Sequence, residues 1–217
     1  IRKYPKKIPN TGIKYATWVW KTNPFTVKIL NLINQANPVA ITPKCNRHKV
    51  EVKVAQLAGF VSDKAAYHHG EMSLQGTIVK LAQDYVGSNN INLFLPNGQF
   101  GSRLLGGKDS ASPRYICTAL SPITKTLFPE DDFPLLDYLD DDGMVIEPNY
   151  YIPILPTALI NGCMGIGTGY STSIPNYDPL DIMNLIRKKM RGESIDDEDI
   201  SPKYRGFTGK IVQKKTR

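Results

Sequence analysis

Two stretches with the same helical periodicity, separated by a glycine, constrain the fold of this chain more than any other feature. In VEVKVAQLAGFVSDKAAYHH (residues 50–69), the spacing of one helix face is kept by Val54, Leu57, Ala58, Val61 and Ala65. In EMSLQGTIVKLAQDYVGS (residues 71–88), it is kept by Leu74, Ile78, Leu81, Ala82 and Tyr85. Gly70 supplies the turn between them, and Gly87 is expected to end the second helix. The sequence therefore predicts two short amphipathic helices joined by a tight turn.

The residues after the second helix predict a β-wing. INLFL (residues 91–95) is typical of a strand, PNG (96–98) of a turn, and RYICTAL (114–120) of a returning strand. The intervening QFGSRLLGGKDSAS (99–112) is rich in small residues and predicts an open loop. Two helices followed by such a wing favour a winged-helix domain.

The second part of the chain has a different composition. PEDDFPLLDYLDDDGMVIEP (residues 129–148) is acidic, and residues 151–179 are apolar and glycine-rich. DPLDIMNLIRKKMRG (178–192) predicts an amphipathic helix with Asp178 or Asp181 near its start and a basic end. Residues 192–217 are typical of a linker and the start of a strand, so we expect a fragment of a longer protein. The fold class expected is α/β (α+β).

Charge is distributed unevenly along the chain. Residues 1–129 carry 17 Lys/Arg and 5 Asp/Glu, a net charge of +12, whereas residues 130–217 carry 10 and 15, a net charge of −5. A surface this basic favours a polyanionic partner, with an ordinary solvated surface as the alternative.

Several classes of site are excluded by spacing. GSRLLGGKDS (residues 101–110) is not a P-loop, because Ser102 stands where the first glycine is required and Asp109 follows Lys108. GIGTG (165–169) is not the GxGxxG of dinucleotide sites. The acidic runs at 130–132, 140–142 and 196–199 are interpreted as solvated, so no metal site is expected in this chain.

The sequence also indicates a compartment. The three cysteines are far apart, odd in number and outside any CxxC spacing, which indicates reduced thiols and no zinc site. No apolar run approaches the length of a membrane span, so no membrane partner is expected. We expect an intracellular protein.

Arg114-Tyr115, at the end of the basic loop, is the pair with the most chemical potential. A phenol is protonated at neutral pH, so a nucleophilic tyrosine needs a neighbouring cation or base. Arg114 can favour the phenolate and bind a phosphoryl oxygen, where charge accumulates as phosphorus becomes five-coordinate. The alternative is a tyrosine that packs under the wing beside a surface arginine.

Two further motifs are open to two interpretations. His68 and His69, in the predicted turn, could contact a phosphate or accept the proton of the tyrosine, or could satisfy backbone groups of the turn. Ile166, between two glycines, could be an apolar wedge pushed between base pairs, or could fold into the core.

Four motifs, taken in order, resemble a known family. They are YHHGEMSL (67–74), NGQFGSRLLGGKDSASPRYI (97–116), EPNYYIPILPTALING (147–162) and GIGTGYSTSIPNYDP (165–179). Residues 51–178 resemble the DNA breakage–reunion core of type IIA DNA topoisomerases, in the branch shared by eukaryotes and their large DNA viruses. The basic segment 1–48 does not match and is interpreted as an insertion, which favours a viral member.

The resemblance implies a role for individual residues. Tyr115 would attack a DNA phosphate, forming a 5′-phosphotyrosine and releasing a 3′-hydroxyl, while Arg114 would stabilise the transition state and His69 would act close to the scissile phosphate. Ile166 would intercalate and bend the duplex. The remaining expected DNA contacts are Tyr67, His68, Ser73, Thr77, Lys80, Gln99, Arg103, Lys108 and Ser110.

The resemblance also implies domains, cofactors and partners. Residues 49–150 would form the winged-helix cleavage domain and residues 151–217 the beginning of an α/β tower domain. Mg²⁺ would be bound by a Toprim domain and ATP by an ATPase domain, neither of which is expected here. The partners would be double-stranded DNA and a second copy of the protein that completes the active site in trans. The fragment alone is expected to be inactive, and its location nuclear if cellular, or host nucleus or cytoplasm if viral.

Two other functions remain open at this point. The chain could be a non-catalytic winged-helix module that binds DNA without cutting it. It could also be a protein-interaction domain that uses its acidic half. Salt-dependent DNA affinity would argue against the latter, because phosphate-neutralising surfaces weaken as salt rises.

Overall fold

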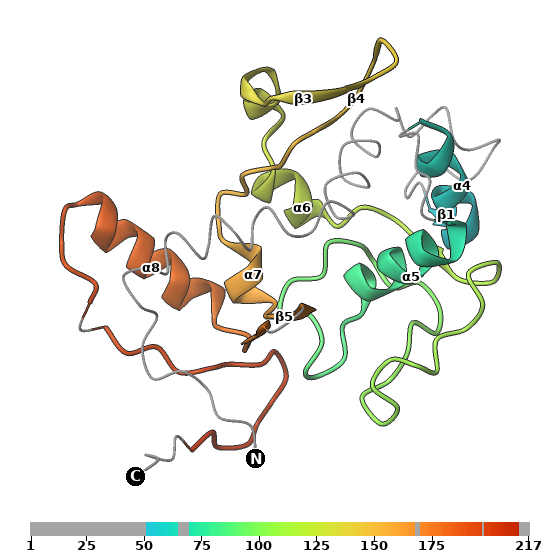
Figure 1. Cartoon of the computed structure of the whole chain (residues 1–217). Helices are drawn as coiled ribbons and strands as arrows, with labels where there is room; N and C mark the ends of the chain where they lie inside the picture. The colour runs from blue at the N-terminus through green and yellow to red at the C-terminus, as the bar shows by residue number, and fades with distance from the viewer. Residues whose placement is uncertain (1–50, 65–69, 168–169, 197, 213–217) are drawn as a thin grey trace.

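The computed structural model describes residues 51–64, 70–167, 170–196 and 198–212, which form a mixed α/β structure (Figure 1). The predictions for residues 1–48 lie outside them. The elements are β1 (Val52–Lys53), α4 (Val54–Lys64), α5 (Glu71–Ala82), β2 (Cys117–Thr118), α6 (Pro122–Leu127), the 3₁₀ helix η1 (Glu130–Leu135), β3 (Tyr138–Asp141), β4 (Met144–Pro148), α7 (Thr157–Ile160), β5 (Cys163–Gly167), β6 (Tyr170–Ile174) and α8 (Pro179–Met190). No helix among the described residues is long and apolar enough to cross a membrane.

The two predicted amphipathic helices are α4 and α5, and their apolar faces form the main core. The predicted core residues that the structure describes as buried are Val54, Leu57, Ala58, Val61, Leu74, Ile78 and Ala82, and Leu81 packs against them half-buried. Phe94, Phe100 and Ile116, which come from the segments after α5, complete the same cluster. The helical periodicity therefore identified the core correctly, except for Ala65, which lies outside the described residues.

Helix α5 ends at Ala82, earlier than the sequence indicated. The prediction continued the helix to Gly87 and placed Tyr85 on its core face, and this is wrong. Gln83 takes an extended backbone conformation, with ψ of 134°, because its side chain turns inward to hold the following loop. Tyr85 lies in the turn after the helix and is only half-buried.

The predicted strands at 91–95 and 114–120 do not form a continuous ladder. They meet only at the isolated bridges Phe94–Leu120 and Asn97–Cys117. Pro96 has no amide hydrogen to donate, and the hydroxyl of Thr118 donates to the carbonyl of Leu95 at 2.8 Å. The returning segment instead pairs its residues 117 and 118 with β1.

The second part of the chain forms two hairpins and a helix. The hairpin of β3 and β4 projects from the top of the view in Figure 1. The glycine-rich stretch around Ile166, expected to be a loop, is instead strand β5, whose alternating glycines leave its five residues free to pair in register with β6. Asp178 begins α8 as its N-cap, accepting a hydrogen bond from the Leu180 amide, as the sequence indicated. The predicted strand near the C-terminus is absent from residues 198–212.

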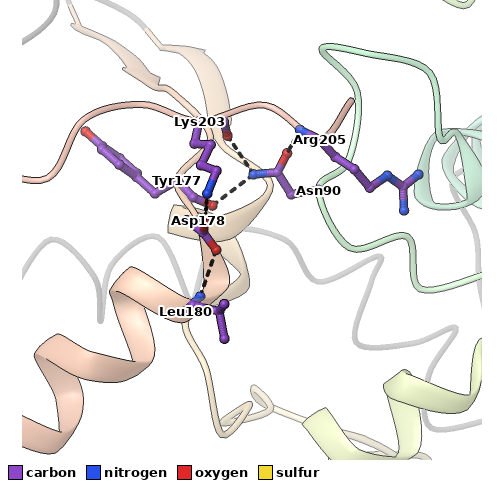
Figure 2. A network of polar contacts seen from close by, with 6 residues as sticks. All are labelled: Asn90, Tyr177, Asp178, Leu180, Lys203 and Arg205. Atoms are coloured by element: carbon purple, nitrogen blue, oxygen red, sulfur yellow. Dashed lines mark hydrogen bonds and ion pairs between the residues drawn. The ribbon is translucent and has the colours of Figure 1, made fainter. Parts of the chain in front are cut away.

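Buried asparagines join segments that are far apart in sequence. The Asn161 side chain pairs with both the amide and the carbonyl of Ile91, each at 2.8 Å. Asn90 bonds the carbonyls of Tyr177 and Lys203 and the amide of Arg205 (Figure 2). These side chains connect the turn after α5 to both ends of the second part.

The ion pair of Asp178 and Lys203 makes part of the stability dependent on pH. The hydrogen bond from Lys203 lowers the pKa of Asp178, with a smaller effect from the Leu180 amide. A carboxyl whose pKa is lower in the folded state stabilises the fold above its unfolded pKa of about 4, and this contribution is lost as the pH falls through the folded value.

We expect Asp178→Asn to lower the free energy of unfolding at neutral pH and to flatten its dependence on pH below about 4. Asparagine is also a good N-cap, so α8 should still form, as circular dichroism would show. Urea titrations at several pH values measure the effect, with the exposed Asp131→Asn as the control. An acid dependence unchanged from the parent would contradict the assignment.

Candidate nucleic-acid interface

Tyr115 presents its ring to solvent, with 81% of the residue exposed, and Arg114 beside it is also exposed. The backbone around the pair is fixed by the start of α4. The amides of Val54 and Ala55 donate to the carbonyls of Ile116 and Pro113, both at 3.1 Å. The first amides of a helix have no partner within it, so here they are satisfied by the two residues that flank Arg114-Tyr115. The pair therefore projects from an immobilised backbone.

The loop that leads to Tyr115 is folded on itself. Ser102 bonds two later residues of the loop, through its amide to Asp109 Oδ1 at 2.8 Å and through its carbonyl to the Gly107 amide at 2.9 Å. The Ala111 amide donates to the Gln99 carbonyl at 2.8 Å. Hydrogen bonds from Ser102, first through its side chain and then through its backbone, lower the pKa of Asp109, which keeps this carboxylate ionised as an acceptor.

Gln83 anchors this loop to the end of α5. Its side chain is buried, with 7% of the residue exposed, and Nε2 donates to the carbonyls of Phe100 at 2.8 Å and Gly107 at 3.3 Å. Tyr85 donates its hydroxyl to Gln83 Oε1 at 3.5 Å, and burial, followed by the charge of Asp109, raises the pKa of Tyr85. The sequence analysis missed Gln83, because a residue beyond the end of a helix carries no periodic signal.

Two glycines allow the loop to approach Gln83 this closely. Gly107 has φ of 79°, and a Cβ there would lie 2.4 Å from Gln83 Nε2. Gly101 has φ of 105°, and its Cβ would lie 2.6 Å from the Cα of Gly107. Both positions exclude a side chain by conformation and by contact.

The structure brings four of the predicted DNA contacts together on this loop. They are Gln99, Arg103, Lys108 and Ser110, of which the first three are exposed and Ser110 is half-buried. Gln99 Nε2 lies 3.5 Å from Asp109 Oδ2, and Arg103 donates to the Val86 carbonyl at 3.0 Å. The loop thus presents two cations and two neutral polar groups next to the exposed tyrosine.

Three further predicted contacts lie on α5. Ser73 and Lys80 are exposed and Thr77 is half-buried, which gives this helix a polar face. The hydroxyl of Thr77 donates to the Ser73 carbonyl within the helix at 2.9 Å, so it is available to a ligand as an acceptor.

The remaining predicted site residues fall on parts that the structure does not describe. Tyr67, His68 and His69 lie outside the described residues. Ile166 is placed by its backbone alone, on β5 opposite Ser171. No group of three or more His, Cys, Asp or Glu side chains that could hold a metal ion occurs among the described residues.

The chain matches the family model for the A-type polypeptide of DNA gyrase/topoisomerase IV over residues 41–217. The chain belongs to the type IIA DNA topoisomerase family. DNA topoisomerase 2 of Arabidopsis thaliana is 63% identical over 161 residues, and DNA topoisomerase 2-alpha of Cricetulus griseus is 57% identical over 165 residues. These alignments cover 74% and 76% of this chain but only 11% of each topoisomerase, so the chain spans about a tenth of the length of these relatives.

A solved topoisomerase structure has a similar fold. The crystal structure of the Plasmodium falciparum topoisomerase II DNA-binding, cleavage and re-ligation domain matches with a TM-score of 0.79 and 45% sequence identity. The match covers 92% of this chain and 26% of that one. The chain is therefore similar to the part of a topoisomerase that this domain represents.

Adjacent glycines provide a matched test of the anchored loop. Gly107→Ala should displace Gln83 and release the loop, which should increase the rate of tryptic cleavage at Arg103 and Lys108. Gly106→Ala should add backbone strain of about 1 kcal/mol, because Gly106 has φ of 60° but no atom within 4 Å of its Cβ position. Equal proteolysis of the two variants would contradict the role given to Gln83.

Proposed function

We propose that this chain is the DNA cleavage part of a type II topoisomerase, in which Tyr115 forms a transient covalent bond to DNA. The observation that carries the proposal is the exposure of Arg114-Tyr115 on a backbone held by α4, within a chain whose family is established. We further propose that residues 49–150 act as a winged-helix domain and residues 151–217 as the start of a tower domain. The helices α4 and α5 with the loop at 98–112 support the first assignment.

The proposed reaction is a transesterification. The phenolic oxygen of Tyr115 attacks phosphorus, the bond from phosphorus to the 3′-oxygen breaks, and the 5′-phosphate remains on the tyrosine. The phenol loses its proton to an acceptor, for which we propose His69, and the 3′-oxygen leaves as a hydroxyl after gaining a proton. Arg114 stabilises the charge on the equatorial oxygens, which is larger in the transition state than in the ground state. Attack by the 3′-hydroxyl reverses the reaction and reseals the strand.

The remaining contacts would position and bend the duplex. Lys80, Arg103 and Lys108 carry charge suited to phosphates, and Gln99 and Ser110 add neutral polar groups beside them. Ser73, Thr77, Tyr67 and His68 extend this proposed surface along α5 and the turn before it. Ile166 is proposed to intercalate, at a cost of a few kcal/mol of base stacking that is offset by the contacts of a bent duplex.

The intact enzyme is proposed to relax and decatenate DNA with ATP and magnesium. When bound, the metal would stabilise the leaving 3′-oxygen. The described residues offer no cluster for it, so its ligands are assigned to a domain outside this chain, as is the ATP site. The active site would be completed by a second copy of the protein, and the enzyme would work in the nucleus, or in the host nucleus or cytoplasm for a viral member.

The non-catalytic alternative is less well supported. A module that only binds DNA has no need to expose a tyrosine next to an arginine on a backbone held from both sides. Covalent capture of DNA distinguishes the two functions directly.

In the intact enzyme, Tyr115→Phe should abolish the covalent DNA–protein complex and leave duplex affinity within about twofold, because only the nucleophilic oxygen is lost. Denaturing gels with 5′-labelled and 3′-labelled DNA measure the complex and the end that is attached. Tyr138→Phe is the matched control, because the Tyr138 hydroxyl bonds the Phe133 carbonyl at 3.2 Å, and it should keep cleavage. Covalent complex formed by the Tyr115→Phe enzyme would overturn the proposal.

A further inference from the structure

Two arginines from distant parts of the chain hold the same turn after α5. Arg103 donates from Nη1 to the Val86 carbonyl at 3.0 Å. Arg205 donates from Nη2 to the Asp84 carbonyl and from Nη1 to Asn92 Oδ1, both at 3.0 Å. Both arginines are exposed to solvent. The turn after α5 is therefore flanked by two guanidinium groups.

The position of Arg205 is built by a buried side chain. Asn90 is 9% exposed and accepts a hydrogen bond from the Arg205 amide at 2.8 Å (Figure 2). Its Nδ2 donates to the carbonyls of Tyr177 and Lys203, also at 2.8 Å. The backbone of residue 205 is thus fixed next to α5 before its side chain makes any contact.

The charges of these two arginines are not compensated by an anion that they contact. The acceptors of both are neutral carbonyl oxygens, and the ion pairs formed among the described residues are Lys188–Glu198, Arg191–Glu193 and Lys203–Asp178. A guanidinium has five N–H donors, so each arginine keeps donors that face solvent. The turn itself contributes one carboxylate, that of Asp84, and Lys80 in the last turn of α5 adds a third cation.

We propose that Arg205, together with Arg103, binds backbone phosphates of duplex DNA at the C-terminal end of α5. This rests on the proposed function, since it extends the proposed DNA surface from the loop at 98–112 to a segment about a hundred residues later. Rigid guanidinium groups with free donors and unpaired charge suit phosphate oxygens. The competing explanation is that Arg205 only ties residues 203–205 to the turn and caps exposed carbonyls.

The test is the salt dependence of duplex affinity in the intact enzyme, measured with a duplex oligonucleotide by fluorescence anisotropy. Arg205→Gln keeps a hydrogen-bond donor but loses the charge, and should reduce the slope of log K against log salt by about 0.9 for one lost phosphate contact. Arg205→Lys keeps the charge and should keep the slope. Lys203→Gln is the matched control, because Lys203 is paired with Asp178 and its loss should leave the slope unchanged.

Arg103→Gln is a second reporter with a single hydrogen bond to lose, and it should reduce the slope by the same amount as Arg205→Gln. Slopes unchanged in both Gln variants, or a loss of affinity shared equally by Arg205→Gln and Arg205→Lys, would overturn the inference and leave the arginine as a structural tie. Formation of the covalent complex through Tyr115 is a separate readout. Its presence with an unchanged slope would refute this inference alone, whereas its absence would refute the proposed function.

Discussion

The start of α4 is the constraint on which the rest of the proposed site depends. A helix begins with amides that lack partners within the helix, and here those of Val54 and Ala55 donate to the carbonyls of Ile116 and Pro113. The same helix buries its apolar face in the core, so the tyrosine backbone is tied to the most stable part of the described structure. A nucleophile is effective when its approach is fixed in advance, because the entropy of orientation is lost on folding and not during the reaction.

The loop before the tyrosine combines exposure at its tip with burial at its base. Leu104 and Lys108 are exposed, whereas Phe100 belongs to the core and Gln83 holds the loop from below. A buried amide with its donors satisfied costs little, but an unsatisfied one would cost about 1–3 kcal/mol. Gln83 therefore favours one arrangement of the loop, and the glycine at 107 makes that arrangement sterically possible.

Charge is separated in space as well as in sequence. The acidic residues of the second part lie largely on η1 and the hairpin of β3 and β4, which project away from α5 in Figure 1. The cations of the proposed DNA surface lie on α5 and the loop at 98–112, and Arg205 joins them from the second part through Asn90. A carboxylate-rich arm kept apart from a cationic face reduces repulsion of a polyanion at that face.

The sequence by itself determined the two core helices, the N-cap of α8, the family and the tyrosine–arginine pair as the candidate site. Those features depend on residues close in sequence, where periodicity and capping report directly on structure. Only the tertiary structure decided that α5 ends at Ala82, that the stretch around Ile166 is a strand, and that Gln83, Asn90 and Arg205 support the proposed surface. Each of those depends on a hydrogen bond to a partner chosen by the packing of distant segments, and a local pattern does not identify that partner.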